Sequence, residues 1–261
     1  MTDVFRGRTA LVTGASAGIG AAMARDLARR GADLVLVARR ADRLEALAAE
    51  CRGLGVRAEA APADLADPAA REALAARFGT IDLLINNAGF GIHAPLAEAA
   101  WERTERLLDV NIIALTHLTR LFAPGMAARG FGRILQVASV VGFLPVPLFA
   151  AYAASKAYVL SLGVALDAEL APRGVRVSVL CPGGTATEFF AVAQGGAAGE
   201  RAGPPRMMSA EAVARIGLDG LARGRPVVVA GGLNRAAVFA TRFAPRALAA
   251  RLAYRAMRRR R

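Results

Sequence analysis

The 261-residue sequence contains little cysteine, histidine or lysine. Its two cysteines, Cys51 and Cys181, are too few for a disulfide framework. No cluster of histidine, cysteine or carboxylate residues has metal-ligand spacing, so we predict that the protein binds no metal. Long apolar runs are also missing, since no stretch reaches the ~18 residues that a membrane-spanning helix needs. The first residues contain no apolar signal core, so we expect a cytoplasmic protein.

Acidic residues are almost absent from the last quarter of the chain. Residues 201–261 contain fourteen arginines but only Glu211 and Asp219, so they account for +12 of the net charge of +13. The first 200 residues are close to neutral. Of the 34 basic residues only Lys156 is a lysine, which indicates that arginine cannot replace it at that position.

Short apolar runs that fit buried strands alternate with segments that fit helices. The predicted strands cover residues 9–13, 34–38, 58–61, 83–86, 134–138, 175–180 and 227–229. The predicted helices cover residues 18–30, 41–52, 68–77, 97–129, 151–171 and 209–223. This alternation predicts one α/β domain with a doubly wound, seven-stranded parallel sheet and right-handed crossovers.

A glycine-rich turn follows the first predicted strand. Gly14, Gly18 and Gly20 have the spacing Gly-x-x-x-Gly-x-Gly, and a predicted helix begins within this stretch. Glycines let the backbone turn sharply and let a pyrophosphate approach the helix N-terminus, where N–H groups point outward. The turn is therefore a candidate dinucleotide site, although alone it also fits an ordinary β–α turn.

Two arginines stand at the end of the second predicted strand. An acid there would bind the adenosine ribose hydroxyl of NAD, whereas an arginine accommodates the additional phosphate of NADP. Arg39 and Arg40 occupy this point, and the nearest acid, Asp33, lies before the strand. We therefore expect NADP(H) rather than NAD(H), although the pair also fits a solvated face of an arginine-rich chain.

Three polar residues predict an acid–base site. Tyr152 and Lys156 are four residues apart in a predicted helix, so their side chains share one face. A neighbouring ammonium favours the phenolate and lowers the tyrosine pKa from its ordinary value of ~10. Lysine suits this role because its compact charge sits on a flexible stem, whereas the arginine guanidinium is planar. Ser139 follows a strand at the sheet edge where ligands bind, so its hydroxyl is placed to hold a carbonyl oxygen beside Tyr152.

From about residue 5 to residue 230, the chain resembles the short-chain dehydrogenase/reductase family. The resemblance rests on motifs in family order and spacing: Thr13-Gly14-x-x-x-Gly18-Ile19-Gly20, Asp64-Leu65, Asn86-Asn87-Ala88-Gly89, Asn111, Ser139, Tyr152-x-x-x-Lys156 and Pro182-Gly183. Each motif is weak alone, but the series is specific. It implies a single Rossmann domain, and the basic C-terminus is similar to that of an NADP-preferring bacterial branch.

The resemblance implies that most of these residues bind the cofactor. Its phosphates and adenosine ribose would contact Gly14, Ser16, Gly18, Ile19 and Gly20. Arg39 would hold the 2′-phosphate, and Asp64 and Leu65 would contact the adenine. The remaining cofactor contacts would come from Asn87, Ala88, Gly89, Pro182, Gly183 and Thr187, and from Tyr152 and Lys156 at the nicotinamide ribose.

The resemblance also implies a catalytic set of Asn111, Ser139, Tyr152 and Lys156. Tyr152 would donate the proton during carbonyl reduction, and Lys156 would lower its pKa. Ser139 would orient the carbonyl, while Asn111 would hold a water molecule that continues a proton relay. The implied activity is the NADP(H)-dependent interconversion of a carbonyl and a secondary alcohol by hydride transfer. A noncatalytic NADP-binding sensor or scaffold is the alternative, but such a protein has no need of the acid–base pair.

Apolar residues surround the expected site and favour a lipophilic or acyl-type substrate. They are Val140, Val141, Phe143, Leu144, Val146, Leu148, Phe149, Phe189 and Phe190, and some of them also fit a plain hydrophobic core. Residues 194–205 are rich in Gly, Ala and Pro, so we expect a lid or substrate loop at about residues 185–208.

We expect residues 1–232 to form the Rossmann domain and residues 233–261 a basic helical extension that is interrupted at Pro245. Arg251, Arg255 and Arg258 fall on one helical stripe, next to Leu248, Leu252 and Ala256. Three partners fit this extension: an anionic membrane surface at the inner membrane face, another subunit, or nucleic acid bound without sequence specificity. The family resemblance implies a homo-dimer or tetramer and no specific nucleic acid.

Overall fold

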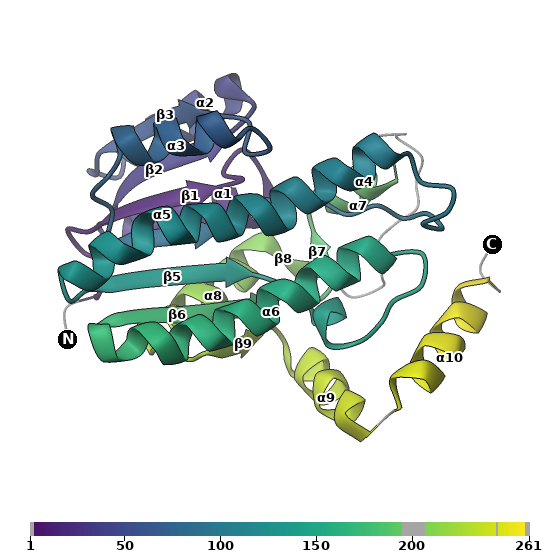
Figure 1. The fold of residues 1–261 in the computed structure, drawn as a ribbon. Coiled ribbons are helices and arrows are strands. Elements are labelled where there is room, and N and C mark those ends of the chain that lie inside the picture. Colours follow the sequence, from purple (N-terminus) through teal and green to yellow (C-terminus); the bar gives the residue numbers. More distant parts are fainter. Residues whose placement is uncertain (1–2, 195–206, 244, 259–261) are drawn as a thin grey trace.

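A parallel sheet of seven strands forms the centre of the protein (Figure 1). The computed structural model describes residues 3–194, 207–243 and 245–258. The strand order is β3-β2-β1-β4-β5-β6-β9, so the chain winds outward in both directions from β1 and β4. The strands are β1 (Thr9–Thr13), β2 (Asp33–Ala38), β3 (Ala58–Pro62), β4 (Leu83–Asn86), β5 (Gly132–Val137), β6 (Val175–Cys181) and β9 (Val227–Val229). This order confirms the doubly wound Rossmann sheet that the sequence predicts.

Helices cover both faces of the sheet, which explains why its strands are apolar throughout. Met23, Leu44 and Leu218 join the buried core on one face, and Leu74 and Phe122 join the core on the other. The helices of the first face are α1 (Gly18–Arg29), α2 (Ala41–Arg52) and α8 (Ala210–Ala222), and those of the second are α3 (Pro68–Arg77), α5 (Leu115–Ala128) and α6 (Ala150–Leu170).

The predicted helix over residues 97–129 begins later and is not uniform. Helix α4 (Trp101–Leu108) leads into a π-helical turn over Asp109–Ala114, and α5 continues from it. A π-turn inserts one residue into the helix and re-aims the side chains around it, and it is often found at functional sites. Asn111 lies within this turn.

The segment after β6 folds over the carboxyl edge of the sheet. A short strand, β7 (Thr185–Ala186), pairs with β8 (Met208–Ser209), and α7 (Phe189–Ala193) lies between them in the sequence. The sequence does not predict this small sheet. Most of the predicted loop at residues 194–205 lies outside the described residues.

The chain ends in two helices, α9 (Gly232–Ala240) and α10 (Arg246–Arg258), which extend away from the sheet (Figure 1). They confirm a helical extension with a break at Pro245, while residues 259–261 lie outside the described part. The division of the chain at residue 232 into two units stays a prediction. Among the helices that the structure describes, none is long and apolar enough to cross a membrane.

Candidate active site

The carboxyl ends of the central strands open into one cleft of about 770 Å³. Most residues that the sequence predicts for the site line it: Gly14, Ser16, Gly18, Ile19, Arg39, Asp64, Leu65, Asn87, Ala88, Gly89, Ser139, Tyr152, Lys156, Pro182, Gly183 and Thr187. Gly20 and Asn111 do not line the cleft. Both are buried behind it, and the cofactor role of Gly20 and the catalytic role of Asn111 stay predictions.

The glycine-rich turn is built by close backbone packing. Gly14 and Gly18 have φ angles of +66° and +57°, in the left-handed region that favours glycine. A Cβ atom on Gly20 would lie 2.3 Å from the carbonyl oxygen of Gly14, so packing leaves no room for a side chain at this position.

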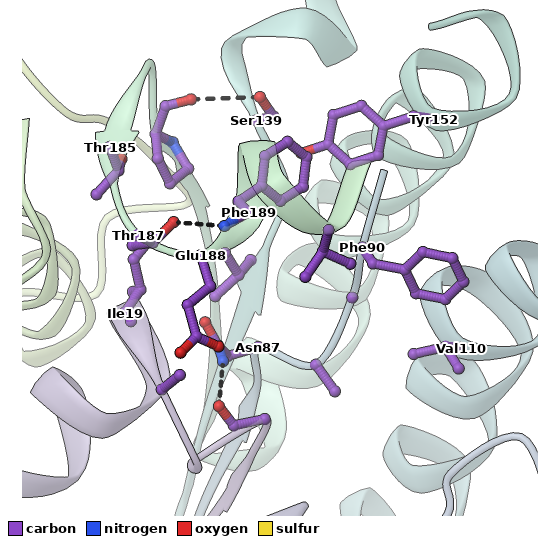
Figure 2. Close-up of a pocket in the computed structure, with 18 of the residues that line it drawn as sticks. Ile19, Asn87, Phe90, Val110, Ser139, Tyr152, Thr185, Thr187, Glu188 and Phe189 are labelled. Atoms are coloured by element: carbon purple, nitrogen blue, oxygen red, sulfur yellow. Dashed lines mark hydrogen bonds between the residues drawn. The ribbon is translucent and has the colours of Figure 1, made fainter. Parts of the chain in front are cut away.

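Two side chains fasten this turn to β4. The hydroxyl of Thr13 donates to the carbonyl of Ile85 and accepts from the backbone N–H groups of Asn87 and Ala88. The side-chain amide of Asn87 donates in turn to the carbonyls of Thr13 at 2.9 Å and Gly14 at 3.3 Å. Asn87 therefore fixes the turn between the two strands at which the sheet order reverses (Figure 2).

The N-terminus of α1 faces the cleft. Ala17 is its N-cap residue, and within the described chain no side chain caps this helix. Ser16, Ala17, Gly18 and Ile19 line the cleft at this end. An uncapped helix N-terminus offers backbone N–H donors and the positive end of the helix dipole to an anion. These residues therefore fit the pyrophosphate of a dinucleotide.

Arginines gather at the cleft end beyond β2. Arg39 is exposed and lines the cleft as predicted. Arg40 donates from Nη2 to the Ser16 hydroxyl at 3.0 Å and pairs with Glu188 at 2.9 Å, contacts that the sequence does not predict. Asp64 pairs with Arg106; burial alone would raise the Asp64 pKa, but hydrogen bonds from Ala66 and Arg106 leave it lowered. Asp64 is therefore held as a carboxylate beside the predicted adenine site.

The other end of the cleft contains the predicted acid–base residues. Tyr152 and Lys156, both on α6, are 8% and 4% exposed. Lys156 Nζ donates to the carbonyl of Val137 at 2.8 Å and lies 5.7 Å from the centre of the Tyr152 ring. Ser139 Oγ donates to the carbonyl of Pro182 and accepts from Val141 N–H, so it also caps the short helical turn Val140–Phe143. Figure 2 shows the Ser139 and Tyr152 side chains next to each other.

Most of the chain matches a known sequence family. The family described as "short chain dehydrogenase" matches residues 8–195. The chain belongs to the short-chain dehydrogenase family. It is therefore an oxidoreductase that acts on alcohol or carbonyl groups, and a nicotinamide dinucleotide is the typical cofactor.

Individual members of this short-chain dehydrogenase family are similar over most of the chain. The oxidoreductase UcpA of Salmonella typhimurium is 41% identical over 182 residues, which cover 68% of this chain and 69% of that protein. The 1-deoxy-11-beta-hydroxypentalenate dehydrogenase of Streptomyces exfoliatus is 39% identical over 225 residues, covering 84% and 81%. A solved short-chain dehydrogenase from Sphingobium yanoikuyae in complex with NADPH is 39% identical and superposes with a TM-score of 0.81, covering 90% and 93%.

The pKa values at the acid–base pair differ from the expectation. Burial raises the pKa of Tyr152 to about 12, while its hydrogen bond with Ser139 acts in the opposite direction. Burial also lowers the pKa of Lys156 to about 8, opposed by the neighbouring Cys181. The net shift of the Tyr152 pKa is therefore upward, and a lowering contribution from Lys156 stays a prediction. Burial is the largest cause of the upward shift, and the Lys156 ammonium donates to the Val137 carbonyl.

Asn111 is used to position the loop after β4. Its amide group accepts from Phe90 N–H at 3.1 Å, donates to the Phe90 carbonyl at 3.0 Å and donates to the Ser155 hydroxyl at 3.0 Å. These bonds tie the π-turn to α6 and to the strand loop that carries Gly89. The water molecule that the short-chain dehydrogenase resemblance assigns to Asn111 stays a prediction.

Aromatic side chains cover the acid–base residues. The Tyr152 ring centre lies 5.2 Å from that of Phe189 and 6.1 Å from that of Phe149. Of the apolar residues predicted around the site, those that line the cleft are Val140, Val141, Val146, Phe149, Phe189 and Phe190. Phe143 and Leu144 line a separate hollow beside α6, and Leu148 is buried, so these three fit the alternative that some of the apolar residues pack away from the cleft.

Several cleft residues have no recognisable signal in the sequence. Phe90, Val110 and Val192 contribute apolar lining, and Arg103 and Arg106 reach the cleft from α4. They come from loops and helices that only the folded chain brings to the sheet edge. Within the described residues, no group of three or more His, Cys, Asp or Glu side chains is placed to hold a metal ion.

We predict that the Lys156 ammonium destabilises the folded protein below about pH 8. Its pKa is about 8 when folded and ~10.4 in an unfolded chain, so the folded state releases this proton first as the pH rises. Without added nucleotide, the free energy of unfolding of the wild type, relative to Lys156→Met, should therefore rise between pH 7 and pH 10. Urea unfolding of both proteins at the two pH values measures this difference. An unchanged difference would show that Lys156 titrates alike in both states.

Proposed function

We propose that the protein is an NADP(H)-dependent oxidoreductase that interconverts a carbonyl and a secondary alcohol on a lipophilic or acyl-type substrate. One observation carries the proposal. A single cleft has Ser139, Tyr152 and a buried Lys156 at one end and exposed Arg39 with Arg40 at the other. A bound NADP(H) would need such an arrangement, because its nicotinamide and its 2′-phosphate are at opposite ends of the molecule.

The chain's residues divide the work of carbonyl reduction. NADPH, when bound, supplies the hydride. Tyr152 is neutral below its pKa of about 12, so its hydroxyl holds the proton that the new alcohol oxygen needs. The Ser139 hydroxyl lies beside it and orients the carbonyl oxygen. The Lys156 ammonium, anchored on the Val137 carbonyl, stabilises the phenolate that remains after proton transfer.

Three groups favour the phosphorylated cofactor. Arg39 and Arg40 follow β2, and Ser16 is already hydrogen-bonded to Arg40. Arginine binds phosphate through charge-assisted and often bidentate hydrogen bonds. The structural relative from Sphingobium yanoikuyae contains NADPH, which supports the same preference and the place of this chain in an NADP-preferring bacterial branch.

The lining of the cleft supports a lipophilic substrate. Phe149 and Phe189 pack against the Tyr152 ring, and Phe190 packs against Phe189. Val140, Val141 and Val146 extend this apolar lining of the cleft. Such a wall binds an apolar body by burial, while a few polar groups fix the orientation of the reacting carbonyl.

The cofactor preference is tested with Arg39→Ala. We expect its NADPH dissociation constant to rise roughly ten-fold or more, because a charge-assisted hydrogen bond contributes roughly 1.5–3 kcal/mol. The NADH constant should change less than about two-fold by the same reasoning. Arg29→Ala, an exposed arginine on α1 away from the cleft, is the control. Equal losses for both nucleotides would remove the phosphate role from Arg39.

The reaction is tested by NADPH consumption with ketones, aldehydes, 3-oxoacyl thioesters and steroids. Turnover of the apolar ketones or thioesters would support the proposal and rank the substrate classes. NADPH binding without turnover of any compound would favour the noncatalytic sensor or scaffold instead.

We also propose that the protein forms a homo-dimer or tetramer. Helices α5 and α6 cover the same face of the sheet (Figure 1), and the hydroxyls of Thr116 on α5 and Tyr158 on α6 lie 3.0 Å apart. The π-turn and α6 expose Ile113, Tyr158 and Val164 on this side. An apolar helical face of this kind is stabilised by burial against a second copy.

We further propose that the protein is cytoplasmic. Its extension, residues 233–261, would bind the anionic lipid surface on the cytoplasmic side of the inner membrane. Leu233, Phe239, Phe243, Leu248 and Leu252 are each more than half exposed. No acid follows Asp219, so the charged residues among these apolar side chains are all arginines. Exposed apolar groups with arginines beside them match the headgroup region of an anionic bilayer. No feature of the extension favours specific nucleic-acid recognition.

We predict that the protein co-sediments with phosphatidylglycerol-containing vesicles, but not with neutral phosphatidylcholine vesicles, at low salt. Arg251→Gln with Arg255→Gln should weaken binding roughly thirty-fold, because each arginine near the surface contributes ~1 kcal/mol. Arg29→Gln with Arg120→Gln, which removes two exposed arginines from other helices, should have little effect. Equal binding to both vesicle types would dismiss the membrane surface, and a change of mass in solution on removing residues 233–261 would favour a subunit contact.

A further inference from the structure

Glu188 connects the two walls of the cleft at its arginine end. It lies between β7 and α7, in the segment that closes over the sheet edge. Its Oε2 accepts from Arg40 Nη1 at 2.9 Å and its Oε1 accepts from Arg43 Nη1 at 2.6 Å. Arg40 precedes α2 and Arg43 is in its first turn, so one carboxylate joins the loop after β6 to the residues after β2.

This ion-pair cluster occupies the place where the proposed function needs a phosphate. Both Arg40 and Glu188 line the cleft, and Arg40 also donates to the Ser16 hydroxyl in the glycine-rich turn. Hydrogen bonds from Arg43 and Arg40 lower the Glu188 pKa, so the carboxylate stays charged at neutral pH. A carboxylate and a phosphate compete for the same guanidinium donors, and the phosphate carries more negative charge.

We infer that Glu188 is an internal competitor of the cofactor's 2′-phosphate and thereby a determinant of nucleotide specificity. Its carboxylate accepts hydrogen bonds from Arg40 and Arg43 until a bound 2′-phosphate replaces it as their acceptor. A nucleotide without that phosphate gains nothing from the two arginines. The inference rests on the proposed NADP(H) dependence. It adds that Glu188 sets how strongly the protein prefers a nucleotide with a 2′-phosphate.

The same contact couples the arginine end to the acid–base end. Phe189, the next residue, packs against the Tyr152 ring at 5.2 Å, and a Cβ atom on Gly91 would lie 2.7 Å from its Cζ. Thr187, the preceding residue, packs against Gly18 of the glycine-rich turn. Release of Glu188 therefore loosens the short segment that covers Tyr152, so binding of the 2′-phosphate prepares the pocket for substrate.

The ion pairs involved are half-exposed, which limits the size of the effect. The side chains of Arg40, Arg43 and Glu188 are 41%, 45% and 48% exposed. Exposed ion pairs contribute little individually, so removing the Glu188 charge should tighten binding of a 2′-phosphate by roughly three- to ten-fold rather than by orders of magnitude.

Calorimetric titration with 2′-AMP and 5′-AMP tests the inference at the arginine end alone. These probes contain no nicotinamide, so the readout is independent of turnover. Glu188→Gln should bind 2′-AMP three- to ten-fold more tightly than the wild type does, with 5′-AMP unchanged. The matched control is Glu45→Gln, which also removes one negative charge. Glu45 lies on α2, and its carboxylate pairs with Arg52.

Three outcomes of the titration separate the two proposals. Tighter 2′-AMP binding by Glu188→Gln alone supports the competitor role. Unchanged or weaker 2′-AMP binding by Glu188→Gln, with a wild type that prefers 2′-AMP to 5′-AMP, overturns it and leaves the NADP(H) proposal intact. If neither the wild type nor Glu188→Gln prefers 2′-AMP to 5′-AMP, the competitor role and the NADP(H) proposal are both overturned.

Hydrogen exchange of the amides in α7 provides a second measurement. Addition of 2′-AMP, but not 5′-AMP, should accelerate exchange in the wild type by several-fold, and Glu188→Gln should exchange at the faster rate without any nucleotide. Slower exchange on adding 2′-AMP would show that the segment closes on the phosphate, which contradicts the inference.

Discussion

The buried ammonium of Lys156 is the interaction around which the site is arranged. A buried cation is costly unless it is hydrogen-bonded, and here the Val137 carbonyl at the end of β5 accepts at 2.8 Å. Two glycines leave room for this lysine, Gly89 beside its ammonium and Gly142 beside its backbone carbonyl. A Cβ atom on Gly89 would lie 3.4 Å from Nζ, and one on Gly142 would lie 2.7 Å from the Lys156 carbonyl oxygen. Because the guanidinium of arginine is wider than an ammonium, we expect arginine to be a poor replacement for Lys156 at this position.

The rest of the cleft is fixed by the reversal of the sheet order between β1 and β4. There Thr13 and Asn87 bind the glycine-rich turn to β4, and Asn111 binds the next loop to α6. These buried polar contacts hold the phosphate end and the acid–base end in one rigid frame. The contacts of Glu188 with Arg40 and Arg43 are half-exposed and weaker, so they are the part of the cleft that a ligand can exchange.

Much of the fold and of the site follows from sequence pattern. The seven strands are apolar because both faces are covered, and each lies within two residues of its predicted bounds. Gly14, Ser139, Tyr152 and Lys156 were recognisable because their spacing reports local geometry, a turn or a helical face. The π-turn at Asn111 was not recognisable, since the turn is held by tertiary bonds from Asn111 to Phe90 and Ser155.

Contacts between distant segments explain what the sequence did not show. Arg40 and Glu188 are 148 residues apart, and Asp64 and Arg106 are 42 residues apart, so no local pattern connects them. The upward shift of the Tyr152 pKa also depends on tertiary packing. The four-residue spacing places Lys156 on the correct face, but the depth of burial and the Val137 carbonyl depend on the packing of α6 against the sheet.

The central claim is that the buried Tyr152 hydroxyl gives the proton to the carbonyl oxygen. The direct measurement compares the wild type with Tyr152→Phe, which removes one oxygen and keeps the ring between Phe149 and Phe189. We expect turnover of a reducible ketone to fall by roughly 10²–10⁴-fold, the usual contribution of a positioned acid, while the NADPH dissociation constant stays within about two-fold. Turnover by Tyr152→Phe at a near wild-type rate would contradict the account.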